Sequence, residues 1–220
     1  FAGGGGSSTG YRLGGGKILL INEFVKEAVR TYSINFPDTP IDSSDIRKIT
    51  RSGKGKKGVL DWFKSYNIKE YDILDGSPPC STFSQVGKGE SKSALENVQY
   101  SDVTQDRIGS LIYEWVYLAN CSLPKICILE NVPEIQRSDI FKNALIKLRS
   151  NYKVNFKELT ASNYGVPQKR KRVYVIGVRN DVCEKVGIDK EEDILDLYPE
   201  ASSYNPTLYD ALHDLELNDK

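Results

Sequence analysis

Short apolar runs alternate along the chain with segments in which apolar residues recur at helical spacing. The apolar and alternating runs predict strands at residues 17–24, 70–76, 124–132, 152–161 and 172–179. The segments with helical spacing predict helices at residues 25–36, 60–67, 107–122 and 138–151. Strands that alternate with helices in this way favour an α/β fold, with one sheet covered by helices on both faces.

The remaining segments of the first half are predicted as turns and loops. Residues 1–15, FAGGGGSSTGYRLGG, are expected to form a glycine-rich turn after a first strand that would precede Phe1. Asp45 is expected in a short loop, and residues 51–58, RSGKGKKG, in a flexible basic loop.

Binding sites in open α/β sheets lie at the carboxyl ends of the strands. The glycine-rich turn, Glu23, Cys80 and Glu130 all fall at or just after such ends. The sequence therefore places its candidate chemistry along one edge of the predicted sheet.

Composition narrows the function classes. The 220 residues include 30 basic and 30 acidic side chains, so a nucleic-acid partner would have to be held by local patches. The four cysteines form no CxxC pair and His213 is the single histidine, which argues against a zinc site and a disulfide scaffold. The apolar runs are too short to span a membrane. We expect a cytoplasmic or nucleoid-associated protein.

The glycines near the amino terminus and Glu23 fit a nucleotide-like ligand. Glycines after a strand let the backbone approach such a ligand closely, and an acid about twenty residues later can accept hydrogen bonds from ribose hydroxyls. Dinucleotide enzymes and methyltransferases both use this pair. The alternative interpretation is a surface turn and an ordinary exposed glutamate.

Cys80 lies directly after two prolines in the stretch GSPPCSTFSQ. Pro78 and Pro79 fix φ and restrain the loop, so that a thiolate could be held in position for nucleophilic attack. The alternative is a buried, inert cysteine, which is common in proteins.

Two further segments carry candidate chemistry. Glu130, in LENV, ends an apolar strand, where it could act as a general acid or only brace a loop. Arg170 and Arg172 lie on one side of the alternating strand in QKRKRVYVIG and could grip a phosphate or a base carbonyl. A solvated basic edge strand is the alternative.

The ordered set FAGGGG, PPCSTFS, ENV and QKRKR resembles the cytosine-5 DNA methyltransferases over nearly the whole chain. The resemblance implies a class I methyltransferase fold, a Rossmann-like sheet with helices on both faces, and use of S-adenosylmethionine with S-adenosylhomocysteine as product. It implies that Cys80 is the nucleophile and Glu130 the acid that meets the base. Arg170 and Arg172 would support the bound cytosine and the loop.

The resemblance also implies a set of cofactor-binding residues. Glu23 would take the ribose hydroxyls and Asp45 the adenine amino group. The other implied positions form the turn, flank the adenosine or line its pocket: Phe1, Ala2, Gly3, Gly5, Phe24, Ile46, Pro79 and Leu111.

The implied partner is double-stranded DNA with a cytosine flipped out of the stack, in a restriction-modification setting. The polar segment 87–104 is long enough to close over the base as a lid. A tRNA-modifying branch shares the same motifs, so a tRNA cytosine-5 methyltransferase stays open. A non-catalytic subunit or fragment of a split methyltransferase is the other alternative.

We expect residues 1–220 to form one catalytic and cofactor-binding domain that lacks its first strand, the target-recognition domain and the final motifs. Either the chain continues, or a second polypeptide supplies target recognition. Otherwise we expect a monomer without a metal site.

Overall fold

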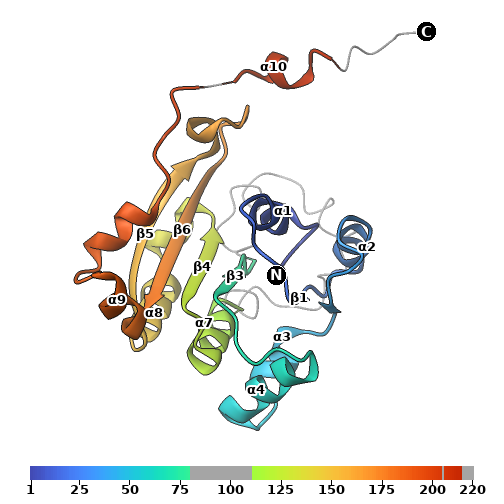
Figure 1. Ribbon diagram of the computed structural model, residues 1–220, viewed down its shortest axis with the longest axis vertical. Coiled ribbons are helices and arrows are strands. Elements are labelled where there is room, and N and C mark those ends of the chain that lie inside the picture. The colour runs from blue at the N-terminus through green and yellow to red at the C-terminus, as the bar shows by residue number, and fades with distance from the viewer. Residues whose placement is uncertain (80–110, 205, 215–220) are drawn as a thin grey trace.

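A computed structural model describes residues 1–79, 111–204 and 206–214 of the chain (Figure 1). Strands β1 and β2 form a parallel pair, and the other strands form a four-stranded sheet in the order β3-β4-β6-β5. The strands predicted after residue 70 are confirmed as β3 to β6. The strands have the bounds β1 Ile21–Asn22, β2 Ile41–Asp42, β3 Ile73–Gly76, β4 Ile126–Asn131, β5 Tyr152–Thr160 and β6 Lys171–Arg179.

Helices connect and cover these strands. The α-helices have the bounds α1 Gly6–Leu13, α2 Lys26–Asn35, α3 Ile46–Thr50, α4 Gly55–Ser65, α7 Leu111–Ser122, α8 Asp139–Leu148, α9 Asn180–Val186 and α10 Leu208–Leu212. Short 3-10 helices are η2 Pro133–Arg137, η3 Ala161–Tyr164 and η4 Glu192–Leu197. In Figure 1, α10 lies on an arm that extends away from the sheet.

Strand β4 lies inside the four-stranded sheet. It pairs in parallel with β3 and antiparallel with β6, which in turn pairs antiparallel with β5. Along β4 the side chains alternate, so that Leu129 is buried while Glu130 points to the opposite face. Burying a leucine side chain contributes about 1.5–3 kcal/mol, so this alternation fixes the register and with it the direction of Glu130.

The core consists of separate apolar clusters. The largest lies between α7, α8 and the four-stranded sheet, and its buried members include Trp115, Leu129 and Phe141. A second cluster joins α3 and α4 to α7 through Ile49, Val59 and Leu118 among others. Helix α7 therefore contributes residues to both clusters.

Three predictions of the first half need correction. Of residues 17–24 only Ile21 and Asn22 form a strand. Their partner strand β2 is equally short, because it begins directly after Pro40, which has no N–H to donate to a neighbouring strand. Residues 6–13 of the predicted glycine-rich turn form α1, despite the low helix propensity of glycine and serine. The basic segment 51–58 is not all loop, since α4 begins at Gly55 and buries Val59 and Phe63.

No helix in the described part of the chain is long and apolar enough to cross a membrane.

Candidate active site

Two neighbouring strand ends bring candidate residues together. Strands β3 and β4 run in parallel with Gly76 opposite Leu129, so the segment after Gly76 leaves the sheet beside Glu130. Gly76 packs closely on Trp115, and a Cβ at this position would lie 2.5 Å from the indole ring. A glycine is therefore required for β3 to pass α7 at this point.

The carboxylate of Glu130 is held by three side chains. The Ser77 hydroxyl donates to Oε2 at 2.5 Å. Arg172 Nε lies 2.9 Å from Oε1, and Arg170 Nη2 lies 3.8 Å from the same oxygen. Because hydrogen bonds and ion pairs to a charged group are directional, they fix the rotamer of Glu130. Its side chain stays 20% exposed, so a ligand can still reach it.

Asn131 ties the proline segment to β4. Its side-chain nitrogen donates to the carbonyl oxygen of Pro78 at 3.1 Å, and its side-chain oxygen accepts from the backbone N–H of Val132 at 2.9 Å. Asn131 is buried, so breaking these bonds would leave polar groups without water. The residue that precedes Pro79 and Cys80 is therefore held against the strand that carries Glu130.

Cys80 and the segment 87–104, predicted as nucleophile and lid, lie outside the described residues. The described thiols are Cys121, Cys127 and Cys183, and all three are buried. Burial raises the pKa of Cys127 to about 12 and also raises the pKa of Cys183. Such thiols are protonated at neutral pH, which makes them poor nucleophiles.

The glycine turn and Glu23 are in direct contact. Glu23 Oε2 accepts from the Gly3 N–H at 2.9 Å and Oε1 accepts from the Val25 N–H at 3.0 Å. Glu23 is 8% exposed, so it is not an ordinary exposed glutamate. Gly3 and Gly5 both have positive φ, and a Cβ on Gly5 would lie 2.3 Å from the Phe36 ring. Glycine is thus required at this turn.

Asp45 follows β2 and caps α3. Its Oδ1 accepts from the backbone N–H of Arg47 at 2.9 Å, and Arg47 Nη2 lies 2.5 Å from Oδ2. The hydrogen bonds from Arg47 hold the pKa of Asp45 below its usual range. Asp45 is therefore an ionised acceptor at neutral pH, at the start of a helix rather than in a loop.

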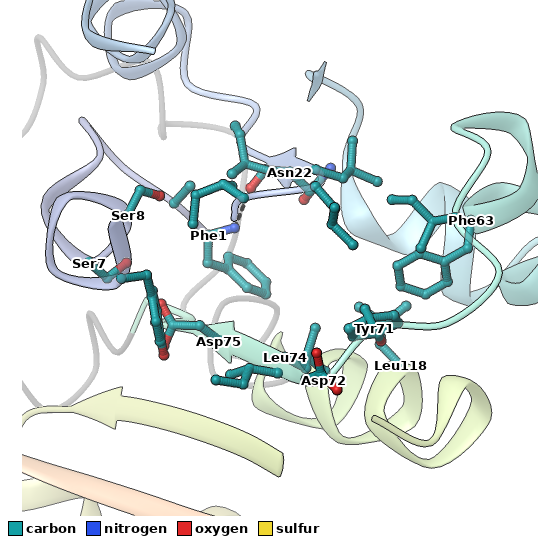
Figure 2. Close-up of a pocket in the computed structure, with 18 of the residues that line it drawn as sticks. Phe1, Ser7, Ser8, Asn22, Phe63, Tyr71, Asp72, Leu74, Asp75 and Leu118 are labelled. Carbon is teal, nitrogen blue, oxygen red and sulfur yellow. Dashed lines mark hydrogen bonds between the residues drawn. The ribbon is translucent and has the colours of Figure 1, made fainter. Parts of the chain in front are cut away.

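The other predicted cofactor residues lie in different environments. Ile46 and Leu111 are buried in the second apolar cluster. Pro79 and Phe24 are exposed, and Phe1 is half-buried. Figure 2 shows the Phe1 ring pointing into a cavity between β1 and β3.

Sequence reasoning missed Ser77 and Asn131. Both are polar residues beside predicted catalytic positions, at the ends of neighbouring strands. Parallel pairing of those strands would have predicted that Ser77 lies near Glu130 and that Asn131 lies near Pro78.

The residues present fit S-adenosylmethionine. Each carboxylate oxygen can accept about two hydrogen bonds, and the backbone uses one on each oxygen of Glu23. Glu23 therefore retains acceptor capacity for ribose hydroxyls. Asp45, which follows β2, has both carboxylate oxygens bonded to Arg47, so an amino group would take the place of an Arg47 donor there.

Helices around a mixed sheet, a glycine turn braced by an acid after β1, and a second acid near the end of β4 are typical of the class I methyltransferase fold. The chain belongs to the C-5 cytosine-specific DNA methylase family, whose family model matches residues 1–219.

Individual relatives agree with this membership. The chain is 32% identical to the type II methyltransferase M.Sau96I of Staphylococcus aureus, over 94% of this chain and 43% of that protein. It is 29% identical to the type II methyltransferase M.AquIA of Picosynechococcus, over 81% of this chain and 70% of that protein. A crystal structure of a candidate DNA modification methyltransferase from an Escherichia coli prophage superposes with a TM-score of 0.69 at 25% identity, covering 100% of this chain and 54% of the other.

The chain spans about half the length of most of the curated relatives it matches.

Proposed function

We propose that the protein transfers a methyl group from S-adenosylmethionine to carbon 5 of cytosine in DNA. The observation that carries the proposal is the fixed carboxylate of Glu130, held by Ser77 and Arg172 beside the segment that leads to Cys80. Family membership over residues 1–219 supports the same reaction.

In this reaction the Cys80 thiolate adds to carbon 6 of the cytosine ring, and carbon 5 becomes nucleophilic. Glu130 at ring nitrogen 3 offsets the negative charge that develops on the ring. Carbon 5 takes the methyl group, and loss of the carbon 5 proton to a base then expels the thiolate. The enzyme is regenerated, and the product is 5-methylcytosine.

The cofactor supplies an electrophilic methyl group when it is bound. Glu23 would accept hydrogen bonds from its ribose hydroxyls and Asp45 from its adenine amino group. Phe24 is exposed beside Glu23 and would contact the adenosine. The turn at Gly3 and Gly5 lets the backbone approach the ligand closely.

The substrate is a cytosine flipped out of double-stranded DNA, since the target atoms are not accessible in a stacked duplex. M.Sau96I and M.Eco47II are about twice as long as the part that this chain matches, and we assign target recognition to residues outside that part or to a second polypeptide. In either form the catalytic half acts as a monomer.

A covalent trap tests the proposal. DNA containing 5-fluorocytosine is incubated with S-adenosylmethionine and the chain, alone and fused to the C-terminal half of a relative. Fluorine does not leave carbon 5 as a cation, so the adduct to Cys80 should persist through denaturing electrophoresis. Cys80→Ser should abolish the adduct, because a serine hydroxyl is barely ionised at neutral pH.

The control is Cys121→Ala, which removes a buried thiol and should leave the adduct in place. Methyl transfer to adenine or to the exocyclic nitrogen of cytosine would reject the assignment. If 5-fluorocytosine forms the adduct in tRNA but not in DNA, the substrate is RNA rather than DNA.

A further inference from the structure

Helix α7 carries one charged side chain in an otherwise uncharged sequence. Its residues 111–122, LIYEWVYLANCS, include Glu114 as the single charged position. The side chain of Glu114 is 8% exposed, so its ionised form is costly in this place unless partners compensate for the lost water. The partners of Glu114 therefore indicate what this residue does.

Glu114 binds the carboxyl end of α3. Its Oε2 accepts from the Thr50 hydroxyl at 2.6 Å, and its Oε1 accepts from Arg51 Nε at 2.7 Å and from Arg51 Nη2. Thr50 is the last residue of α3, and Arg51 follows it as the C-cap. Hydrogen bonds to a charged group are stronger than neutral ones. The carboxylate thus holds two consecutive residues at one end of the helix.

The other end of α3 carries the residues assigned to the adenine. Asp45 is the N-cap of α3, and Ile46 is its first residue. An α-helix rises ~1.5 Å per residue, so the five residues of α3 span only about 7 Å. A helix this short is not stable by itself. The position of Asp45 therefore depends on the tertiary contacts of α3.

One face of α7 supplies such contacts. Leu111, the first residue of α7, belongs to the same apolar cluster as Ile46 and Ile49 of α3. Leu111 lies three positions before Glu114, and residues at this spacing lie on the same face of a helix. This face supports α3 by apolar packing and, at Glu114, by hydrogen bonds.

Arg47 links the two acids electrostatically. Its hydrogen bonds to Asp45 raise the pKa of Arg47, and the negative charge of Glu114 acts in the same direction. An amino group that binds Asp45 would take the place of an Arg47 donor. The charge of Glu114 would then still stabilise the displaced guanidinium, which makes that exchange of donors less costly.

We propose that Glu114 is a positioning residue for the adenine end of the cofactor site. It holds α3 so that the carboxylate of Asp45 can accept the adenine amino group, and it acts through α3 rather than by contact with the cofactor. The role of Asp45 is taken from the proposed function, on which this inference rests.

Calorimetric titration with two ligands tests this role. S-adenosylhomocysteine carries the adenine amino group, and in its deamino analogue hydrogen replaces that group. Wild type should bind S-adenosylhomocysteine more tightly, because the analogue gives Asp45 no donor. Glu114→Gln should weaken binding of S-adenosylhomocysteine by about tenfold, the effect of losing roughly one hydrogen bond to a charged group. It should leave the affinity for the analogue nearly unchanged.

Variants of Thr50 repeat the test without removing the buried charge. Thr50→Val deletes the hydroxyl that bonds Glu114 and should also reduce the preference for S-adenosylhomocysteine, whereas Thr50→Ser keeps the hydroxyl and should restore it. Thr50→Val carries the test if Glu114→Gln does not fold. In an Asp45→Asn background, Glu114→Gln should cause no further loss of affinity, because the residue through which it acts is already changed.

The matched control is Glu191→Gln. Glu191 accepts from Arg149 at 2.7 and 2.9 Å, in an ion pair between α8 and η4. This change should leave the affinities for both ligands as in wild type.

Amide hydrogen exchange, measured by mass spectrometry without ligand, gives a second readout. Glu114→Gln should speed exchange in residues 48–51 by about tenfold and leave residues 26–35 unchanged. Unchanged exchange in residues 48–51 would overturn the proposal. So would an equal loss of affinity for both ligands, since Glu114 would then only stabilise the fold. If wild type bound neither ligand, the proposed function would fail, and this inference with it.

Discussion

The hydroxyl of Ser77 lies 2.5 Å from Oε2 of Glu130, and the two residues are 53 positions apart in the chain. Ser77 follows β3, whereas Glu130 lies near the end of β4. Their hydrogen bond joins the start of the proline segment to the acid that would meet the base. The segment that begins at Ser77 is therefore tied directly to the strand that carries Glu130.

The first prediction concerns this bond. Ser77→Ala should slow formation of the 5-fluorocytosine adduct by about tenfold. A hydrogen bond to a charged group is worth ~1.5–3 kcal/mol, and because Ser77 is exposed we expect its bond to contribute at the lower end of this range. The loss should fall on the rate constant of the chemical step and leave the KM for DNA unchanged. Ser77→Thr keeps the hydroxyl and should restore most of the rate.

Ser150→Ala serves as the matched control. Its exposed hydroxyl, just after α8, donates to the carbonyl oxygen of Lys147 and accepts from the side chain of Asn151. An equal loss of rate in this control would show that the effect of Ser77→Ala does not come from its hydrogen bond to Glu130.

The second prediction ranks the two arginines. Arg172 lies 2.9 Å from Glu130 and is 21% exposed, whereas Arg170 lies 3.8 Å away and is 52% exposed. Because exposed pairs at longer distance contribute ~0–1 kcal/mol, Arg170→Ala should reduce the trapping rate less than Arg172→Ala does. The control is Lys171→Ala, which removes an ion pair between the first residue of β6 and Glu158 on β5. The reverse ranking would contradict the geometry.

The sequence predicted β4 and the position of Glu130 well, because PKICILENV is a single apolar run that ends in polar residues. It also predicted from period two that Arg170 and Arg172 share one side of a strand, and both side chains face Glu130, although Arg170 lies just before β6. It could not predict which partner they face. That depends on antiparallel pairing of β4 with β6, where Glu130 lies opposite Tyr174.

The first half of the chain was harder to predict for a physical reason. The run KILLI has the composition of a buried strand, but a strand forms only where a neighbour offers backbone groups. Helix α1 shows the opposite discrepancy. Its sequence, GSSTGYRL, is poor in residues that favour helices, and yet it forms a helix. It is held by tertiary contacts such as the hydrogen bond from Tyr32 to Ser8, which no local pattern reveals.

The third prediction concerns Glu23. Glu23→Ala should raise the dissociation constant for S-adenosylmethionine by roughly tenfold or more, because two ribose hydroxyls lose a charged acceptor. It should also lower the free energy of unfolding by about 1–3 kcal/mol, since the N–H groups of Gly3 and Val25 lose their acceptor.

Calorimetry at a temperature where both proteins remain folded separates the two effects. Glu27→Ala, on the exposed side of α2, should change neither quantity. Unchanged affinity in Glu23→Ala would mean that Glu23 only braces the turn.

The last prediction concerns pH and Asp42, which is buried at the end of β2. Trp62 Nε1 donates to Asp42 Oδ2 at 2.6 Å, and the backbone N–H of Ser44 donates to Oδ1 at 2.7 Å. Burial alone would raise the pKa of Asp42, but hydrogen bonds from Ser44, Trp62 and Tyr66 together hold it below its usual value.

A carboxyl whose pKa is lower in the folded state stabilises the fold above its unfolded pKa of about 3.9. That contribution is lost as pH falls through the lower folded value. Asp42→Asn cannot titrate, so it should reduce the urea midpoint at pH 7 and flatten its decline below about pH 4. Asp139→Asn, whose carboxyl is 91% exposed, should keep the wild-type profile. The urea midpoints are measured by circular dichroism. If they decline equally with falling pH in wild type and Asp42→Asn, Asp42 gains no stabilisation from these donors.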